Sequence, residues 1–449
     1  MKIKIKIIDN ITAQVLQGKD SVKELLSFPA VYYRQSQFRK IKTEYNKNIL
    51  FGKGNSYLYV GNIPRIRKYA EKNGIEFELE GEVEHITASS KPFIEGVEIR
   101  DYQLEAINSA VKHQRGVING ATGVGKSLIS IGICSCFSNP KVLYLVPNLD
   151  LLNQASDGFT KYGYKNCKLG NGQKNITEDV VISTIQTMSR MDLLQIADLF
   201  DITILDEAHL AIKSSGTVEK ILSILLSPIR IALTGTPPKE KEQTLILEGL
   251  TGEIIYNIGA SAAIEKGILM NPKIKLLKVP KMKDVRFNTY REYYTFGIVD
   301  NKQRNNIVCT EAIEFANKNE NVIIFVKEIE HLNNICVILK EKGVDFESVH
   351  GIIEGTERNK IKKRIMDGKC RIVVSSVVWT TGLDIPNLSV IILAAGGKSE
   401  QTLLQTIGRG LRKSDGKESA IVVDFLDPYK YLSEHCIERV GTYVGLNWL

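Results

Sequence analysis

The sequence predicts an α/β protein in which two tandem parallel-sheet domains follow a small, basic α/β N-terminal domain. Two observations lead to this prediction. Val/Ile/Leu runs alternate with helical stretches from about residue 100 onward, and basic residues concentrate before residue 70. The chain has 449 residues, of which 43% are apolar and 24% charged, which is enough for about three domains. We place them at residues 1–92, 93–272 and 273–449.

The N-terminal domain is predicted from short, well-punctuated segments. Residues 2–8 alternate lysine with isoleucine, which indicates a half-buried strand with a lysine ridge. Residues 56–63 read as a further strand, and Pro64 opens a helix that runs to Asn73. Residues 75–80 return as a strand, and a polar connection follows over residues 81–92.

Two series of buried strands define the larger domains. Near-continuous aliphatic runs bounded by turn residues are typical of strands buried on both faces, and therefore of parallel sheets covered by helices. A polar, helix-compatible stretch around Asn301–Glu314 separates the two series. The first series comprises RGVING, KVLYLVP, DVVIST, DITILDEA and RIALTGT, and the second comprises NVIIFVK, DFESVHG, RIVVSS, SVIILAA and SAIVVDF.

The composition argues against a membrane protein and against a fold built around a structural metal. No apolar run approaches the roughly 18 residues of a membrane span, and the first residues lack the apolar core of a signal peptide. Seven scattered cysteines include no Cys-x-x-Cys, and the six histidines offer no zinc spacing. We expect a soluble cytoplasmic protein with reduced, mostly buried thiols.

Charge and aromatic residues gather at the N-terminus. Residues 1–70 hold fourteen Lys/Arg, four acids and nine of the 33 aromatic residues, whereas the other 379 residues hold 45 basic and 47 acidic groups. This pattern predicts a module that binds a polyanion. A solvated basic surface over an ordinary small core remains the alternative. The candidate contacts are Lys2, Lys4, Lys6, Arg34, Arg39, Arg65 and Arg67.

A phosphate-binding loop follows the first strand of the first series. Residues Gly120–Ser127 match G-x-x-x-x-G-K-[ST], a loop whose backbone N–H groups surround an anion at a helix N-terminus. Lys126 is expected at the β- and γ-phosphates and Ser127 on Mg²⁺, so the predicted ligands are ATP and Mg²⁺. The alternative is a structural Gly-rich turn. Further candidates in this loop are Gly120, Thr122, Gly123 and Gly125.

An acidic pair follows a buried strand eighty residues later. Ligands of open α/β sheets collect at the carboxyl ends of strands, where Asp206 and Glu207 follow DITIL. Asp206 can bind the metal, while Glu207 can polarise the attacking water. A solvated acidic helix start is the alternative.

A third element, Gln405–Arg412, lies in the second α/β domain. Arg409 and Arg412 are three residues apart and share one face of a helix. Across an interdomain cleft they could stabilise charge on the γ-phosphoryl group, as arginine fingers do. Taken alone, this segment is equally compatible with a basic surface helix.

The ordered motifs resemble a superfamily 2 DExH-type helicase core over about residues 100–430, most like phage branch-migration helicases of the UvsW type and their XPB-like relatives. The matching segments are Arg100-x-Tyr102-Gln103, Gly120–Ser127, Asp206–His209, Thr234-Gly235-Thr236, Ser375–Pro386 and Gln405–Arg412. The resemblance implies two RecA-like domains with ATP between them.

The resemblance also implies residue roles. Gln103 and Arg100 would hold adenine, and Gly382 and Asp384 would lie near the nucleotide. His209 and Gln405 would link the nucleotide to the Thr234-Gly235-Thr236 segment and the interdomain cleft. Thr381 stands where relatives often have a carboxylate, so that role is not transferred. The nucleic-acid backbone would contact Asn148, Ser183, Thr184, Gln186, Lys327, Ser375 and Ser376. Helix capping or turn formation is the alternative for these short polar loops.

The expected function is that of an ATP-dependent DNA helicase or translocase on branched DNA, in branch migration, fork regression or Holliday-junction processing. An RNA helicase or a remodelling translocase without strand separation is the runner-up, and a DNA-binding protein that uses ATP only as a switch is the third possibility. Residues 387–404 leave no room for a long strand-separating pin before Gln405. We expect a monomer, working as a phage protein in the bacterial host cytoplasm.

Overall fold

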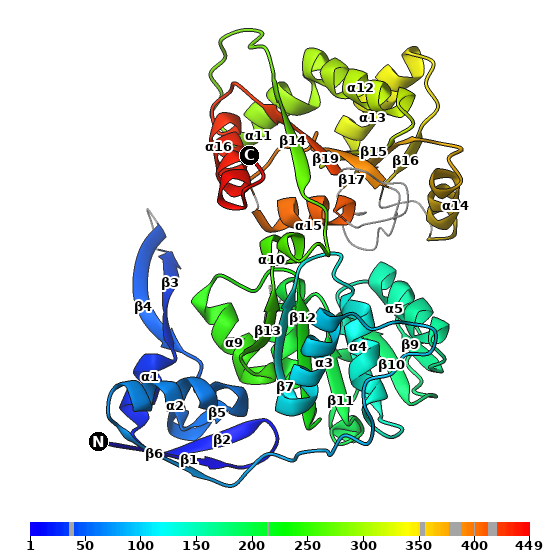
Figure 1. Ribbon diagram of the computed structural model, residues 1–449. Coiled ribbons are helices and arrows are strands. Elements are labelled where there is room, and N and C mark those ends of the chain that lie inside the picture. Colours follow the sequence, from blue (N-terminus) through cyan, green and yellow to red (C-terminus); the bar gives the residue numbers. More distant parts are fainter. Residues whose placement is uncertain (36–39, 213–214, 351–354, 377–387, 399, 412–419) are drawn as a thin grey trace. The chain divides into compact units, whose positions relative to one another are not determined.

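The computed structural model describes residues 1–35, 40–212, 215–350, 355–376, 388–398, 400–411 and 420–449 (Figure 1). For residues 32–35 and 40–43, and for Gln405 and Arg409, it describes the backbone alone. The chain forms two compact units. Unit 1 contains residues 1–120 and 125–257, and unit 2 contains residues 121–124 and 258–449.

The N-terminal sheet has four strands in the order β5-β2-β1-β6. The predicted strand at the start is confirmed as β1, with Ile3 and Ile5 fully buried. The predicted helix is confirmed as α2, with Pro64 in its first turn. The bounds are β1 Lys2–Ile7, β2 Thr12–Gln17, α1 Lys19–Leu25, β5 Tyr57–Tyr59, α2 Ile63–Lys72 and β6 Glu76–Glu80.

The predicted strand over residues 56–63 is wrong in length. Only Tyr57–Tyr59 is a strand, and a 3₁₀ turn, η2 (Val60–Asn62), replaces the rest. Gly61 in this turn packs so closely on helix α9 (Lys241–Thr251) that a Cβ there would overlap the Glu248 carbonyl oxygen. Tight packing against the first parallel-sheet domain therefore ends the strand.

A β-hairpin that the sequence pattern did not predict follows α1. Strands β3 (Ser27–Gln35) and β4 (Lys40–Asn48) pair antiparallel over nine residues each. They form a two-stranded sheet of their own that extends away from the four-stranded sheet (Figure 1). Lys47 near its base pairs with Glu242 of α9 at 3.3 Å.

The first large sheet has the strand order β13-β7-β12-β11-β8-β10-β9. The predicted parallel strands are confirmed as β7, β8, β10, β11 and β12, whereas β9 was not predicted. Alternate residues of its strands enter two apolar cores, one on each face. The strands are β7 Arg115–Gly120, β8 Val142–Val146, β9 Asn166–Leu169, β10 Val180–Thr184, β11 Ile202–Leu205, β12 Ile229–Thr234 and β13 Ile254–Ile258. The helices are α3 Asp101–His113, α4 Lys126–Ser135, α5 Leu149–Lys161, α6 Ile185–Met188, α7 Ala208–Ala211, α8 Ser215–Leu222 and α9.

The second large sheet has the strand order β14-β19-β18-β15-β17-β16, and each pair of neighbouring strands in it is parallel. The polar stretch between the two series is helix α12, as predicted. The strands are β14 Pro272–Lys278, β15 Asn321–Val326, β16 Glu347–Val349, β17 Ile372–Ser376, β18 Leu388–Ile392 and β19 Ala420–Leu426. The helices are α10 Ala260–Glu265, α11 Tyr290–Tyr294 with a π-turn after it, α12 Lys302–Asn317, α13 Ile329–Glu341, α14 Gly355–Met366, α15 Glu400–Gly410 and α16 Leu432–Gly445.

The N-terminal segment is docked firmly within unit 1. Arg65 of α2 makes a double hydrogen bond to the Glu248 carboxylate of α9, with both donor–acceptor distances 2.8 Å. The Tyr59 hydroxyl donates to Glu219 of α8 at 2.7 Å. Leu245 of α9 lies in the core of the N-terminal sheet. The domain boundary at residue 92 stays a prediction, but the packing makes residues 1–80 part of a shared body.

Two general expectations can be compared with the described residues. Of the seven cysteines, five are buried and two are half-buried, which confirms the prediction of mostly buried thiols. Within the described part of the chain, none of the helices has the length and apolar character that crossing a membrane requires.

Candidate active site

The phosphate-binding loop joins strand β7 to helix α4. Gly125 has φ 87° and Gly123 has φ 99°, a left-handed conformation that glycine adopts without strain. Lys126 begins α4, and its Nζ donates to the Gly120 carbonyl oxygen at 3.2 Å. Ser127 follows in the first turn of the same helix, where backbone N–H groups are free of intrahelical partners. Thr122 and Gly123 belong to the four-residue segment grouped with unit 2.

The acidic pair lies at the carboxyl end of β11. The Lys126 Nζ is 3.9 Å from Glu207 Oε1, so the two motifs meet within unit 1. Burial, and then the charge of Glu207, raise the pKa of Asp206 to about 6. Asp206 Oδ1 accepts the Glu207 backbone N–H at 2.8 Å. Glu207 Oε2 is buried without a hydrogen-bond partner, although it lies 3.4 Å from His209 Nδ1.

His209 connects the acidic pair to the TGT segment after β12. Its Nδ1 lies 2.9 Å from Thr234 Oγ1. The Thr234 hydroxyl already donates to the Thr236 carbonyl oxygen at 2.9 Å, so His209 Nδ1 must be the donor in their bond. The implied link from the acidic pair to this segment is therefore present.

Gln103 lies between the start of α3 and the phosphate-binding loop. Its Oε1 accepts the Arg100 backbone N–H at 3.1 Å and so caps the helix. A Cβ added at Gly125 would lie 2.5 Å from Gln103 Nε2, so glycine at that position leaves room for the Gln103 amide. The Arg100 guanidinium lies 3.4 Å from the Tyr102 hydroxyl.

The candidates of the second domain are only partly described. Gln405 and Arg409 lie on helix α15, whose backbone alone is described at these two residues. Gly382, Asp384 and Arg412 lie outside the described residues. Their predicted roles at the nucleotide stay predictions.

In the first domain, the polar loop residues divide by exposure. Asn148 and Thr184 are helix N-caps, whose side chains accept the N–H groups of Leu151 at 3.0 Å and Thr187 at 3.2 Å. Ser183 is fully buried, and its hydroxyl donates to the Thr184 carbonyl oxygen. The predicted contact of Ser183 with nucleic acid stays a prediction. Gln186 is exposed.

The second domain shows the same division. Ser375 is fully buried, and its hydroxyl donates to the Ser376 carbonyl oxygen at 3.0 Å, so its contact with nucleic acid stays a prediction. The Ser376 hydroxyl is buried, and no described residue lies within hydrogen-bond distance of it. Lys327 is exposed at the end of β15, with its Nζ 5.3 Å from the centroid of the Tyr294 ring.

The lysine ridge of β1 is largely neutralised. Lys2 pairs with Glu76 at 2.8 Å and Glu78 at 2.6 Å, while Lys4 pairs with Glu78 and Glu80 of the neighbouring strand β6. Residues 71–92 hold six acids and two lysines, which the charge count over residues 1–70 had left out.

The other basic candidates have different surroundings. Arg65 is engaged with Glu248, whereas Arg67 stacks on Phe77 with its guanidinium carbon 5.3 Å from the ring centroid. Lys6 is exposed. Arg34 lies on β3, with its backbone alone described, and Arg39 lies outside the described residues.

One residue at the site was missed by the sequence reasoning. Tyr144 is buried in the middle of β8, and its hydroxyl donates to Asp206 Oδ2 at 2.8 Å. In the sequence it reads as one more core residue of KVLYLVP, because nothing local marks a tyrosine that reaches a neighbouring strand.

The site is chemically suited to a nucleoside triphosphate with a divalent cation. Two neighbouring carboxylates, one with an unpartnered buried oxygen and the other with a raised pKa, face a lysine at a helix N-terminus. A cation would relieve the repulsion between the carboxylates, and Asp206 and Ser127 provide the oxygen ligands that Mg²⁺ prefers. Among the described residues, no group of three or more His, Cys, Asp or Glu side chains could hold a metal ion.

Comparisons with known proteins agree with this geometry. Residues 96–239 match the family described as type III restriction enzyme, res subunit, and residues 303–414 match the helicase conserved C-terminal domain. The chain is 27% identical over 436 residues to ATP-dependent DNA helicase uvsW of Enterobacteria phage T4, covering 87% of this chain and 86% of that protein. It is 26% identical over 399 residues to DNA 3'-5' translocase XPB2 of Sulfurisphaera tokodaii, covering 79% and 88%.

Solved structures share the fold. A structure of the ATP-dependent type ISP restriction-modification enzyme LlaBIII bound to DNA has a TM-score of 0.61 at 19% identity, covering 84% of this chain and 32% of that one. S. cerevisiae Dbp5 bound to RNA and ADP BeF3 has a TM-score of 0.56 at 15% identity, covering 80% and 94%. With two tandem parallel-sheet domains, a phosphate-binding loop facing an Asp-Glu-Ala-His segment, and both helicase family matches in order, the chain belongs to the superfamily 2 helicases of the DExH type.

Proposed function

We propose that this chain is an ATP-dependent DNA helicase or translocase that acts on branched DNA, in branch migration, fork regression or Holliday-junction processing. The observation that carries the proposal is the connected set Lys126, Glu207, His209 and Thr234 within unit 1, which places the phosphate-binding lysine beside the acidic pair. Two similar proteins, uvsW and XPB2, are named as a DNA helicase and a DNA translocase.

In the proposed reaction, each residue of unit 1 has one task. Backbone N–H groups of the loop and Lys126 hold the β- and γ-phosphates, and Glu207 orients a water molecule and accepts its proton. Asp206 and Ser127 would hold Mg²⁺, which when bound supplies positive charge that offsets charge on the transferred phosphoryl group. Gln103 and Arg100 hold the adenine ring.

The second domain completes the proposed cycle. We assign Gln405, Arg409 and Arg412 to the γ-phosphate, and Gly382 and Asp384 to the nucleotide, from their positions in the helicase motifs. Guanidinium groups that bind ATP more tightly than ADP make domain closure depend on the γ-phosphate, so hydrolysis reopens the domains. Repeated closure would move the chain along a nucleic-acid backbone.

We propose that the nucleic acid lies across side chains that contact its sugar-phosphate backbone without reading the base sequence. Exposed Gln186 and Lys327 are the strongest candidates, one in each large domain. The N-cap side chains of Asn148 and Thr184 and the buried Ser376 hydroxyl are weaker candidates, because the first two already serve their own helices.

The proposed grip on branched DNA lies on the hairpin rather than on the β1 ridge. Residues 27–48 contain five basic residues, one acid and five aromatic residues. Lys2 and Lys4 are offset by the glutamates of β6, Arg65 by Glu248 and Lys47 by Glu242. The hairpin segment still holds four basic residues close together in the sequence, namely Arg34, Arg39, Lys40 and Lys42. A protruding basic, aromatic hairpin suits contact with phosphates and unstacked bases.

The alternative is an RNA helicase or a remodelling translocase without strand separation, because an RNA-bound protein shares the same fold. The test is ATP hydrolysis by the full chain with single-stranded DNA, duplex, forked, four-way-junction and RNA substrates. We expect the four-way junction and fork to stimulate hydrolysis most. Stimulation by RNA alone would overturn the DNA assignment. We further propose a monomer that works in a bacterial host's cytoplasm, since similar proteins come from phages T4 and T5.

A further inference from the structure

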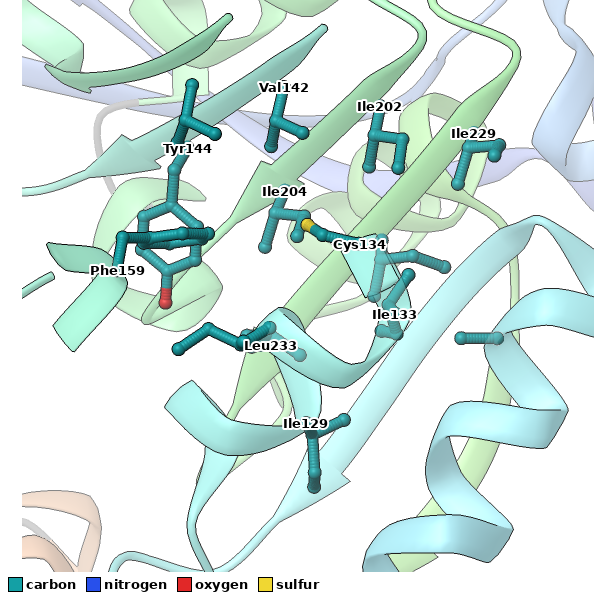
Figure 2. Close-up of a cluster of buried hydrophobic side chains, with 14 of the residues drawn as sticks. Ile129, Ile133, Cys134, Val142, Tyr144, Phe159, Ile202, Ile204, Ile229 and Leu233 are labelled. Atoms are coloured by element: carbon teal, nitrogen blue, oxygen red, sulfur yellow. The ribbon is translucent and has the colours of Figure 1, made fainter. Parts of the chain in front are cut away.

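Tyr144 occupies an unusual place in the first large domain. Its side chain is 1% exposed and belongs to the apolar core that also contains residues of α4. Its ring packs edge-to-face on that of Phe159, with the centroids 5.5 Å apart. Figure 2 shows its hydroxyl pointing toward the part of the core near Leu233 and Ile129, away from Val142 at the start of the strand. The side chain therefore runs along the sheet toward the carboxyl ends of the strands.

Strand pairing explains why Tyr144 reaches the acidic pair. β8 and β11 are parallel neighbours in which Tyr144 is opposite Ile204, and Asp206 follows two residues later. Residues two apart in a strand lie on the same face, so Asp206 continues the row that contains Ile204. A tyrosine is long enough to span that step, and its hydroxyl meets Asp206 Oδ2 at 2.8 Å.

Both oxygens of Asp206 are thereby oriented by donors from its own domain. Oδ2 accepts the Tyr144 hydroxyl, and Oδ1 accepts the Glu207 backbone N–H at 2.8 Å. Ser130, one turn after Lys126 on α4, donates its hydroxyl proton to the Lys126 carbonyl oxygen instead. The Tyr144 hydroxyl therefore connects strand β8 directly to the acidic pair that follows β11.

We propose that Tyr144 is a positioning residue that fixes the Asp206 carboxylate for magnesium, a role that rests on the ATP site of the proposed function. Hydrogen-bond donors to a ligating carboxylate hold it in the rotamer that the metal needs, so they reduce the cost of ordering the ligand. The hydroxyl of Tyr144 acts only through Asp206 and touches neither phosphate nor water in the reaction. If the Tyr144 hydroxyl were purely structural, it would still need a hydrogen-bond partner in the core. Its removal would then leave the magnesium affinity of the site unchanged.

The test is magnesium-dependent nucleotide binding by the full chain with Tyr144→Phe, which removes the hydroxyl and keeps the ring on Phe159. Tyr164→Phe is the matched control, because Tyr164 packs edge-to-face on the same Phe159 ring with the centroids 5.7 Å apart. Tyr164 comes from the loop between α5 and β9, whereas Tyr144 bonds the acidic pair. A fluorescent ADP analogue is titrated first in EDTA and then over a series of MgCl₂ concentrations.

We expect Tyr144→Phe to need about tenfold more MgCl₂ for half of the gain in nucleotide affinity, with the affinity in EDTA unchanged. Tyr164→Phe should follow the wild-type curve. A wild-type magnesium curve for Tyr144→Phe, or an equal loss of affinity in EDTA, would overturn the positioning role. Absence of any magnesium effect in the wild-type chain would instead overturn the metal site itself, and the role with it.

Discussion

Glu207 has a left-handed backbone conformation, with φ 46° and ψ 48°. For a residue with a Cβ this conformation costs about 1–2 kcal/mol, so the surroundings must hold it in place. Asp206 does so, since its Oδ1 accepts the Glu207 N–H. The bend brings the Glu207 carboxylate within 3.9 Å of Lys126 Nζ. Backbone strain here is thus associated with the placement of the proposed catalytic base.

Replacing the proposed base tests this assignment. Glu207→Gln keeps the backbone N–H that bonds Asp206 but cannot accept a proton from water. We expect ATP hydrolysis to fall by about 100- to 10,000-fold while nucleotide binding is retained. Single-turnover hydrolysis and binding of a fluorescent ATP analogue measure the two effects. Glu219→Gln is the control, since Glu219 accepts the Tyr59 hydroxyl away from the acidic pair. Hydrolysis at the wild-type rate by Glu207→Gln would contradict the base assignment, whereas a Glu207→Gln variant that binds ATP and keeps full function would support ATP as a switch only.

His331 gives a prediction in the second domain. Burial, and then the nearby Arg304 charge, lower the pKa of His331 to about 3, and its Nε2 bonds Asn305 Oδ1 at 3.0 Å. A depressed histidine pKa means that the unfolded chain binds the proton more readily than the folded chain. Stability should therefore fall as the pH drops from about 6.5 to 3, by up to about 1.4 kcal/mol per pH unit.

The measurement is the melting temperature of the full chain and of His331→Gln between pH 7 and pH 4. Glutamine can still donate to Asn305 but does not titrate, so the variant should lose less stability on acidification than the wild type. Parallel pH curves for the two proteins would contradict the prediction.

At the residue scale, the sequence located the motifs but not the individual contacts. Lys126, Asp206 and Glu207 could be found because the spacing of the motifs is specific. The bonds of the Ser183 and Ser375 hydroxyls to the carbonyl oxygen of the next residue could not be predicted, because a hydroxyl that bonds the backbone and one that bonds a phosphate have the same local sequence. Tyr144 was missed because its partner is 62 residues away.

At the scale of elements, the buried strands were the predictable part. A strand covered on both faces is nearly all aliphatic, so β8, β11 and β15 stand out in the sequence. In the β3–β4 hairpin, β4 is mostly polar and charged, and β3 has a proline and an unbroken apolar and aromatic run, so no alternating apolar face identifies it. The edge strand β9 has only four residues, NCKL, and shows no pattern either.

The contact between η2 and α9 gives a prediction about an element junction. A Cβ at Gly61 would overlap the Glu248 carbonyl oxygen and lie 2.6 Å from that of Gly249. Because both neighbours are backbone atoms, Gly61→Ala should destabilise unit 1 by about 1–3 kcal/mol, as overpacking does. Chemical denaturation of the full chain measures the loss.

Gly158 provides the matched control for this junction. It lies within α5, and an added Cβ meets nothing within 4 Å. Gly158→Ala should therefore be neutral, or stabilising by about 0.5–1 kcal/mol through helix propensity. Equal stability of the Gly61→Ala and Gly158→Ala variants would show that the N-terminal segment is not held where the structure places it.

The hairpin gives the second prediction at this scale. Joint substitution of Arg34, Lys40 and Lys42 by alanine removes three basic residues from β3 and β4. If all three contact phosphates, the slope of log affinity against log salt should become shallower by about 2.7 on duplex DNA. Fluorescence anisotropy over a salt series measures it. Joint Lys2→Ala and Lys4→Ala is the control, because these lysines are already paired with glutamates; an equal slope change for both variants would contradict the assignment.

At the scale of the whole molecule, the N-terminal segment and the first large domain share their cores. Leu245 of α9 lies in the N-terminal core, while Ile11 and Tyr59 lie in a core of the first large sheet. Deleting residues 1–90 would expose both apolar surfaces, so loss of activity in such a truncation would report unfolding as much as DNA binding. A substitution on the hairpin leaves these cores intact and separates the two effects.

The proposed division of labour can therefore be tested in the intact chain. The ATP residues lie in the large domains, and the grip on branched DNA is assigned to the hairpin. The Arg34, Lys40 and Lys42 triple alanine variant should keep ATP hydrolysis stimulated by single-stranded DNA, because Gln186 and Lys327 remain for the track. Its branch migration of four-way junctions should fall by roughly tenfold or more, since each lost charged contact with DNA weakens the grip on the arms.

Gel-based migration of a labelled junction and a coupled ATPase assay, run on the same preparation, measure the two activities. The paired Lys2→Ala and Lys4→Ala variant should retain both. An equal loss of ATPase and migration in the hairpin variant would place the hairpin in the motor itself. Undiminished migration would remove the hairpin from the DNA grip, and the exposed Lys6 and Arg67 would then be the remaining basic candidates of the N-terminal segment.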